Sequence, residues 1–138
     1  MDCAYIHYCG GYKYQLSRNF WIHIPIKGQE VITDYFTLTK DGLLTIHAGY
    51  AWDGPSGPTI DTPSFMRGSM VHDSLYQAMR LGLLPQACRK DADIILRNLC
   101  LEDGMWRVLA WWVYRAVRKF AAPAARPDHK KKIMVAPG

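Results

Sequence analysis

His72 and Asp73 are neighbours in the segment Val71-His72-Asp73-Ser74-Leu75-Tyr76, and both side chains are of types that carry out hydrolysis. An imidazole can take a proton from water near neutral pH, and a carboxylate is an oxygen ligand for a hard cation. Neighbouring helical residues lie about 100° apart, so the two can face one cavity from a single turn. Tyr76 comes one helical turn after His72 and lies above it on the same face. This spacing predicts a metal-assisted hydrolytic site.

A second carboxylate, Asp93, lies 21 residues after His72, in a segment that should form the next helix. Across an antiparallel helix pair it would hold one imidazole nitrogen protonated and leave the other to accept a proton from water. Asp91 competes for this role. Two residues along a helix are about 200° apart, so only one acid can face His72. The apolar neighbours Ile94 and Leu96 favour Asp93.

A Gly/Pro-rich loop, Asp53-Gly54-Pro55-Ser56-Gly57-Pro58, precedes the His-Asp segment and contains a third acid. Glycines let the backbone approach an ion closely. Asp53, Asp73 and the loop carbonyls would form an oxygen-rich ligand set, which suits Ca²⁺ better than Zn²⁺. Taken alone, Asp53-Gly54 is most simply a turn, and a helical histidine more often has a structural role.

The first half of the sequence has the alternating pattern of half-buried strands, in the segments 12–16 and 20–24. Residues 34–39 and 43–47 flank Lys40-Asp41-Gly42, and Asp-Gly between two such segments predicts a hairpin. Residues 48–63 read as a loop.

The second half has helical periodicity. Ser64 is the expected N-cap of a helix that ends near Leu81, with Gly82 as its stop. Further helices are expected over residues 86–100 and from about 104 to 120. The third carries an apolar stripe made of Trp106, Leu109, Ala110, Val113, Tyr114 and Val117. We therefore predict an α+β fold in which an N-terminal antiparallel β-sheet is followed by three helices.

The composition suits one globular domain over residues 1–122 and a basic tail over 123–138, because 49% of the 138 residues are hydrophobic. The net charge is +5, of which the tail holds +3. The remaining +2 argues against specific nucleic-acid binding. We expect no transmembrane segment and no secretion signal. The four cysteines form no CxxC pair, which predicts reduced thiols in the cytoplasm of the producing cell, with Cys88 and Cys100 in the core.

Several of these segments occur together in known proteins. The matching segments are the loop Asp53–Pro58, then Pro63 and Phe65, His72-Asp73-x-x-Tyr76, Arg89-x-x-x-Asp93 and Ala110-Trp111-x-x-Tyr114-x-Ala116-Val117-x-x-Phe120. This pattern resembles a small family of uncharacterised phage and prophage proteins. More distantly, residues 53–120 resemble the phospholipase A(2) superfamily, especially its short bacterial members.

The resemblance implies a calcium-dependent acyl hydrolase whose substrate is a lipid or another acyl compound. His72 would activate water, Asp93 would orient His72, and Tyr76 would help to position the site. The implied Ca²⁺ ligands are the carboxylates of Asp53 and Asp73 and the carbonyl oxygen of Gly54.

Two other functions are open at this point. The secreted lipases have disulfides around the His-Asp helix, whereas Val71 and Ser74 stand in the adjacent positions here. This departure from the lipases makes a second function possible, in which the chain is not a catalyst. It would be a structural or accessory protein of a phage particle, which uses the scaffold to contact other phage proteins. The weaker alternative is a metal phosphohydrolase with His47 as an upstream ligand. His47 lies in a predicted strand, and that fold is all-helical.

Overall fold

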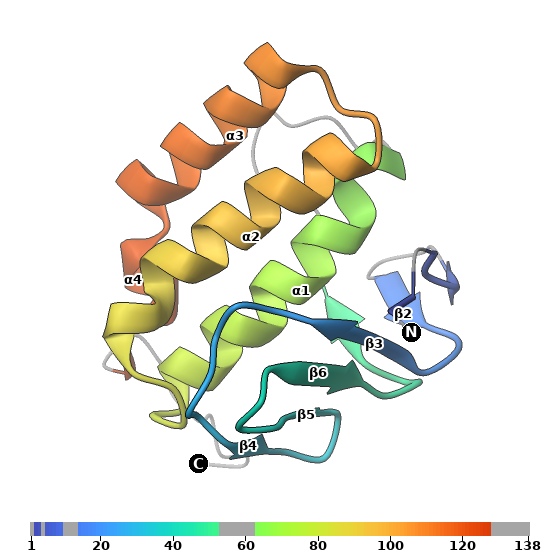
Figure 1. Ribbon diagram of the computed structural model, residues 1–138, viewed down its shortest axis with the longest axis vertical. Coiled ribbons are helices and arrows are strands. Elements are labelled where there is room, and N and C mark those ends of the chain that lie inside the picture. Colours follow the sequence, from blue (N-terminus) through green and yellow to red (C-terminus); the bar gives the residue numbers. More distant parts are fainter. Residues whose placement is uncertain (1, 4, 10–13, 53–62, 128–138) are drawn as a thin grey trace, which may run out of the picture.

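The computed structural model describes residues 2–3, 5–9, 14–52 and 63–127. The strands in these ranges are β1 (Tyr8–Cys9), β2 (Tyr14–Leu16), β3 (Phe20–His23), β4 (Val31–Ile32), β5 (Phe36–Leu38), β6 (Leu43–Ile46) and β7 (Ala51–Trp52). The helices are α1 (Pro63–Arg80), α2 (Arg89–Glu102), α3 (Arg107–Phe120) and the short α4 (Ala122–Ala125), with a 3₁₀ turn η1 (Gln86–Cys88) before α2. The strands precede the helices, which confirms the α+β fold (Figure 1).

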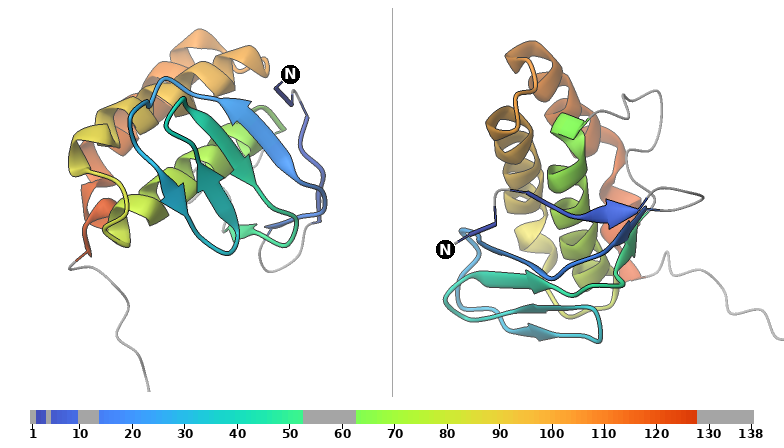
Figure 2. Two further views of the ribbon diagram at one scale, coloured as in Figure 1. Left: turned by 60° about the horizontal axis from the view of Figure 1, so that its bottom comes forward. Right: turned by 90° about the vertical axis from the view of Figure 1, so that its right-hand side faces the viewer.

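The strands form two antiparallel sheets with the orders β3-β6-β5-β4 and β1-β2-β7. Along β3, Phe20 and Ile22 are buried while Trp21 and His23 are exposed, so one face of the larger sheet meets the core. Figure 2 shows the helices gathered on one side of this sheet, with α1 beside it. Buried residues of the strands, α1 and α2 share one hydrophobic cluster. The sheet therefore acts as a platform for the helix pair.

Strands β5 and β6 pair across the predicted Asp-Gly turn, so the hairpin is confirmed. Gly42 has a φ of +95°, and its carbonyl accepts a 2.8 Å hydrogen bond from the Ile24 amide. A Cβ at this position would lie 2.5 Å from the carbonyl oxygen of Ile24. Both the backbone conformation and the space require glycine here.

We expect Gly42→Ala to lower the free energy of unfolding by about 2 kcal/mol or more, because it combines an unfavourable φ with a backbone clash. Gly28→Ala is the matched control. Gly28 also has a positive φ, of +81°, but a Cβ there would meet nothing within 4 Å. Urea denaturation should show a clearly larger loss for Gly42→Ala than for Gly28→Ala. Equal losses would mean that the clash at Ile24 is relieved without cost.

Helices α1 and α2 approach each other closely at Gly68. A Cβ there would lie 3.1 Å from Cδ1 of Leu96 and 3.3 Å from Sγ of Cys100. His72 comes one turn after Gly68 on α1, and Asp93 comes just under one turn before Leu96 on α2. Because the close approach at Gly68 brings the two helix axes together, it also brings His72 within reach of Asp93.

Three helix boundaries differ from the prediction. Ser64 lies inside α1 rather than capping it, because Pro63, whose fixed φ suits a first helical position, already begins the helix. Gln86 begins η1, so α2 itself starts at Arg89. In the third helix the residue before Arg107, Trp106, is extended and 83% exposed, so it does not belong to the buried stripe.

Part of the segment assigned to the tail is ordered. Helix α4 covers Ala122–Ala125, and Ala125 is fully buried. Arg80 and Gln86 donate hydrogen bonds to the carbonyls of Ala124 and Ala125 at 2.9 and 2.6 Å. These bonds satisfy carbonyls at a helix end and attach the segment to α1 and η1. Within the described residues, no helix is both long and apolar enough to cross a membrane.

Candidate functional site

His72 and Asp93 meet between α1 and α2, and the distance from Nε2 of His72 to Oδ1 of Asp93 is 2.7 Å. Asp93 is fully buried and His72 is almost so. Asp91 lies on the exposed side of α2. The expectation that Asp93 rather than Asp91 contacts His72 is therefore confirmed.

Tyr76 completes the contact from the same face of α1. Its hydroxyl donates a hydrogen bond of 2.6 Å to Oδ1 of Asp93, the oxygen that His72 also contacts. The rings of His72 and Tyr76 lie 4.1 Å apart between centroids, tilted by 35°. Tyr76 therefore fixes the carboxylate and the imidazole ring at once.

Two arginines bind the other side of Asp93, and sequence reasoning gave neither a role. Arg118 of α3 donates from Nη1 to Oδ2 of Asp93 at 2.9 Å. Arg89, at the start of α2, has its Nη1 3.8 Å from the same oxygen and 3.3 Å from the Tyr76 hydroxyl. Arg89 also donates to the carbonyls of Val117 and Arg118, both at 3.2 Å. Arg89 begins the quoted segment Arg89-x-x-x-Asp93, whereas Arg118 stands at an unspecified position of the last quoted segment. Only their positions in the fold show that they converge on Asp93.

The surroundings keep Asp93 ionised. Burial alone would raise the pKa of its carboxyl, but hydrogen bonds from His72, Tyr76 and Arg118, together with the attraction of the His72 ring when it is protonated, outweigh burial and lower the pKa. The pKa of Tyr76 is raised by burial and by its bond to Asp93, so Tyr76 remains a protonated donor. Asp93 is thus an anion that only accepts hydrogen bonds.

This charge state determines the tautomer of His72. Because an ionised carboxylate cannot donate, the Nε2 of His72 must carry the proton in their shared bond. In the neutral form of the ring, which is the form that can act as a base, the lone pair is then on Nδ1. Among the described residues, no hydrogen bond is made by Nδ1 of His72. The arrangement is that of a base whose second nitrogen is oriented by a carboxylate.

Of the three predicted calcium ligands, only Asp73 lies in the part of the chain that the structure describes. Asp73 is half-buried on α1, directly after His72. Asp53 and Gly54 lie outside the described residues. In the part of the chain that is described, no three His, Cys, Asp or Glu side chains come close enough to hold a metal ion, and this includes His47. The calcium site therefore stays a prediction.

A second buried cluster lies at the other end of the helix pair. Buried Arg67 donates from Nε and Nη2 to the two carboxylate oxygens of Asp103, at 3.1 and 2.9 Å. Its Nη1 donates to the carbonyl of Cys3 at 3.1 Å, which attaches the N-terminal segment to α1. Burial raises the pKa of Asp103, although Arg67 acts against this. This ion pair was not predicted.

A pocket of about 240 Å³ lies between β3 and α2, next to Arg67. Its wall includes Asp2 and His23, which form a pair 2.7 Å apart. His72, Tyr76 and Asp93 do not line it.

The cysteines are only partly as expected. Cys100 is buried and its pKa is raised to about 12 by burial, whereas Cys88 is half-buried. Cys3 is a free thiol.

Comparisons with protein-family models, with curated proteins and with solved structures found no match to this chain.

Proposed function

We propose that the chain is a calcium-dependent acyl hydrolase of phage or prophage origin, with His72 as the general base. The observation that carries this proposal is the contact between Nε2 of His72 and the buried, ionised Asp93. A histidine on the protein surface can form its hydrogen bonds with water and needs no buried carboxylate beside it. Here a fully buried carboxylate is held in place by three donors and directs one nitrogen of the ring.

In this proposal Nδ1 of His72 takes a proton from water, and the resulting hydroxide attacks the acyl carbonyl carbon. Asp93 stabilises the positive charge that then develops on the imidazole. When the bond from carbon to the leaving oxygen breaks, the same nitrogen returns the proton to that oxygen. The carboxylate of Asp73 is an oxygen donor of the kind Ca²⁺ prefers, and the ion would supply stabilisation of the oxyanion. Tyr76 and Arg118 hold Asp93 in position and do not touch the substrate.

The calcium requirement gives the first test. Wild-type protein should release fatty acid from phospholipid vesicles at millimolar Ca²⁺ and not with a chelator. Asp73→Asn should abolish the heat of Ca²⁺ binding in calorimetry, because it replaces an anionic ligand with a neutral one. Asp91→Asn removes an equal charge from the exposed side of α2 and should bind like wild type. An absence of heat from wild-type protein at millimolar Ca²⁺ would contradict the proposal.

A second function, that of a non-catalytic phage structural or accessory protein, is favoured by a different observation. Asp93 joins α1, α2 and α3 through His72, Tyr76, Arg89 and Arg118, which is also what a purely structural network does. The pocket near Arg67 does not reach His72. In that case the protein would act in the cytoplasm of the producing cell or in a phage particle through contacts with other phage proteins.

A further inference from the structure

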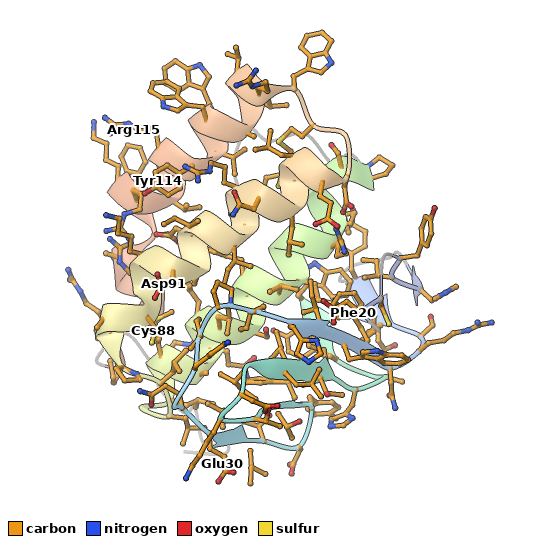
Figure 3. The ribbon with its side chains drawn as sticks, viewed as in Figure 1. Phe20, Glu30, Cys88, Asp91, Tyr114 and Arg115 are labelled. Atoms are coloured by element: carbon orange, nitrogen blue, oxygen red, sulfur yellow. The ribbon has the colours of Figure 1, made fainter. Side chains whose placement is uncertain are left out.

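The outer face of α3 is both apolar and basic. We define it by six exposed residues, Val108, Trp111, Trp112, Arg115, Lys119 and Phe120. The opposite side of the helix, with Ala110 and Val113, packs into the molecule. Val108 is 69% exposed, Trp112 61% and Phe120 71%, so these large side chains are not needed for the core. Figure 3 shows Arg115 projecting from the side of α3 that faces away from α2.

The charged residues of this face lie against its aromatic rings. The guanidinium of Arg115 is 5.7 Å from the ring centre of Trp111, and the ammonium of Lys119 is 5.4 Å from that of Phe120. Trp111 and Trp112 contact each other edge to face at 5.2 Å. Helix α3 contains no acidic residue, and Arg107 and Arg118 bring its basic residues to four. The face therefore favours a partner that is negatively charged and also accepts aromatic side chains.

A second copy of the chain does not fit this requirement. A symmetric contact between two such faces would oppose Arg115 and Lys119 of one copy to the same cations of the other, with no carboxylate on either helix. Single-stranded nucleic acid has the right charge, but its binding sites are positively charged grooves, whereas this face is the convex side of one helix. A membrane surface takes both kinds of residue, because Trp enters the headgroup region and Lys or Arg attracts anionic lipids.

We propose that the outer face of α3 binds the surface of anionic lipid bilayers, with the helix axis parallel to the membrane plane. Trp111, Trp112 and Val108 enter the headgroup region. Arg115 and Lys119 remain at the level of the lipid phosphates. This binding does not depend on hydrolysis or on Ca²⁺.

The test is co-sedimentation of the full chain with vesicles made of equal parts phosphatidylglycerol and phosphatidylcholine, in the presence of a chelator. Trp111→Ala/Trp112→Ala should weaken binding about tenfold or more, because it removes two interfacial side chains. Arg115→Ala/Lys119→Ala should weaken it about twenty-five-fold, or roughly fivefold for each charge. The matched controls are Ile32→Ala and Arg18→Ala/Lys27→Ala, which remove exposed apolar and basic groups from the strand half and should bind like wild type.

The proposal is supported if both α3 variants lose binding and pure phosphatidylcholine vesicles bind much less than anionic ones. It is overturned if wild-type protein does not bind anionic vesicles, or if the α3 variants bind as well as the controls. Displacement of the protein from vesicles by a single-stranded oligonucleotide at lower concentration than the lipid would also overturn it. Because the chelator prevents calcium-dependent hydrolysis, failure of the hydrolase proposal would leave these results unchanged.

Discussion

Replacing Asp93 with alanine should lower the free energy of unfolding by about 3–5 kcal/mol. The loss comes from the groups left behind rather than from the missing carboxylate. His72 and the Tyr76 hydroxyl are buried and would lose their acceptor. Arg118, which is partly exposed, can turn toward water and recover part of its solvation. Asp93 would therefore be the single carboxylate on which the packing of all three long helices depends most.

Asp91→Ala provides a control on the same helix. It removes an exposed carboxylate two residues away, so its effect should stay within about 0.5 kcal/mol. Urea denaturation measured in parallel for both variants gives the comparison. Similar losses for the two would mean that the contacts around Asp93 contribute little to stability.

The difference in unfolding free energy between wild type and Asp93→Ala should depend on pH, because the pKa of Asp93 is lowered in the folded protein. A carboxyl whose folded-state pKa lies below its unfolded value contributes stability above the unfolded pKa, near 3.9, and loses it as the pH falls through the folded value. The difference between wild type and Asp93→Ala should be complete above about pH 5 and shrink below about pH 4.

The sequence was sufficient for the helix pair because its signals are local. Helical periodicity, the 21-residue spacing and the apolar neighbours of Asp93 together determine which acid faces His72. The Asp41-Gly42 turn is equally local, since it depends on one backbone conformation. Features of this kind can be found before any tertiary structure is known.

Arg118 shows what the sequence could not provide. It lies 25 residues from Asp93 on another helix, and nothing in its neighbourhood distinguishes it from Arg115 or Lys119. Which basic residue of α3 turns inward depends on how the helix is rotated against α2. Trp106 shows that the sequence pattern also fails to tell a buried apolar residue from an exposed one. It was expected to belong to the apolar stripe of the third helix, but it is exposed.

His72→Ala should reduce calcium-dependent fatty-acid release from phospholipid vesicles by about 10²- to 10⁴-fold, the usual loss when a general base is removed. The variant should remain folded, because Asp93 keeps its hydrogen bonds from Tyr76 and Arg118. The urea midpoint of the variant, measured alongside the rate, shows whether a lower rate comes from the missing base or from unfolding of the protein.

Two further variants determine what the loss means. Tyr76→Phe keeps the ring beside His72 and removes one hydrogen bond to Asp93, so it should slow the reaction much less than His72→Ala. His47→Ala removes a half-buried imidazole from the residue that follows β6 and should leave the rate unchanged. A lower rate for His47→Ala would instead favour the phosphohydrolase alternative.

If wild type and His72→Ala release fatty acid at equal rates, the bond between His72 and Asp93 serves only to hold α1 against α2. The structural phage protein then becomes the better proposal.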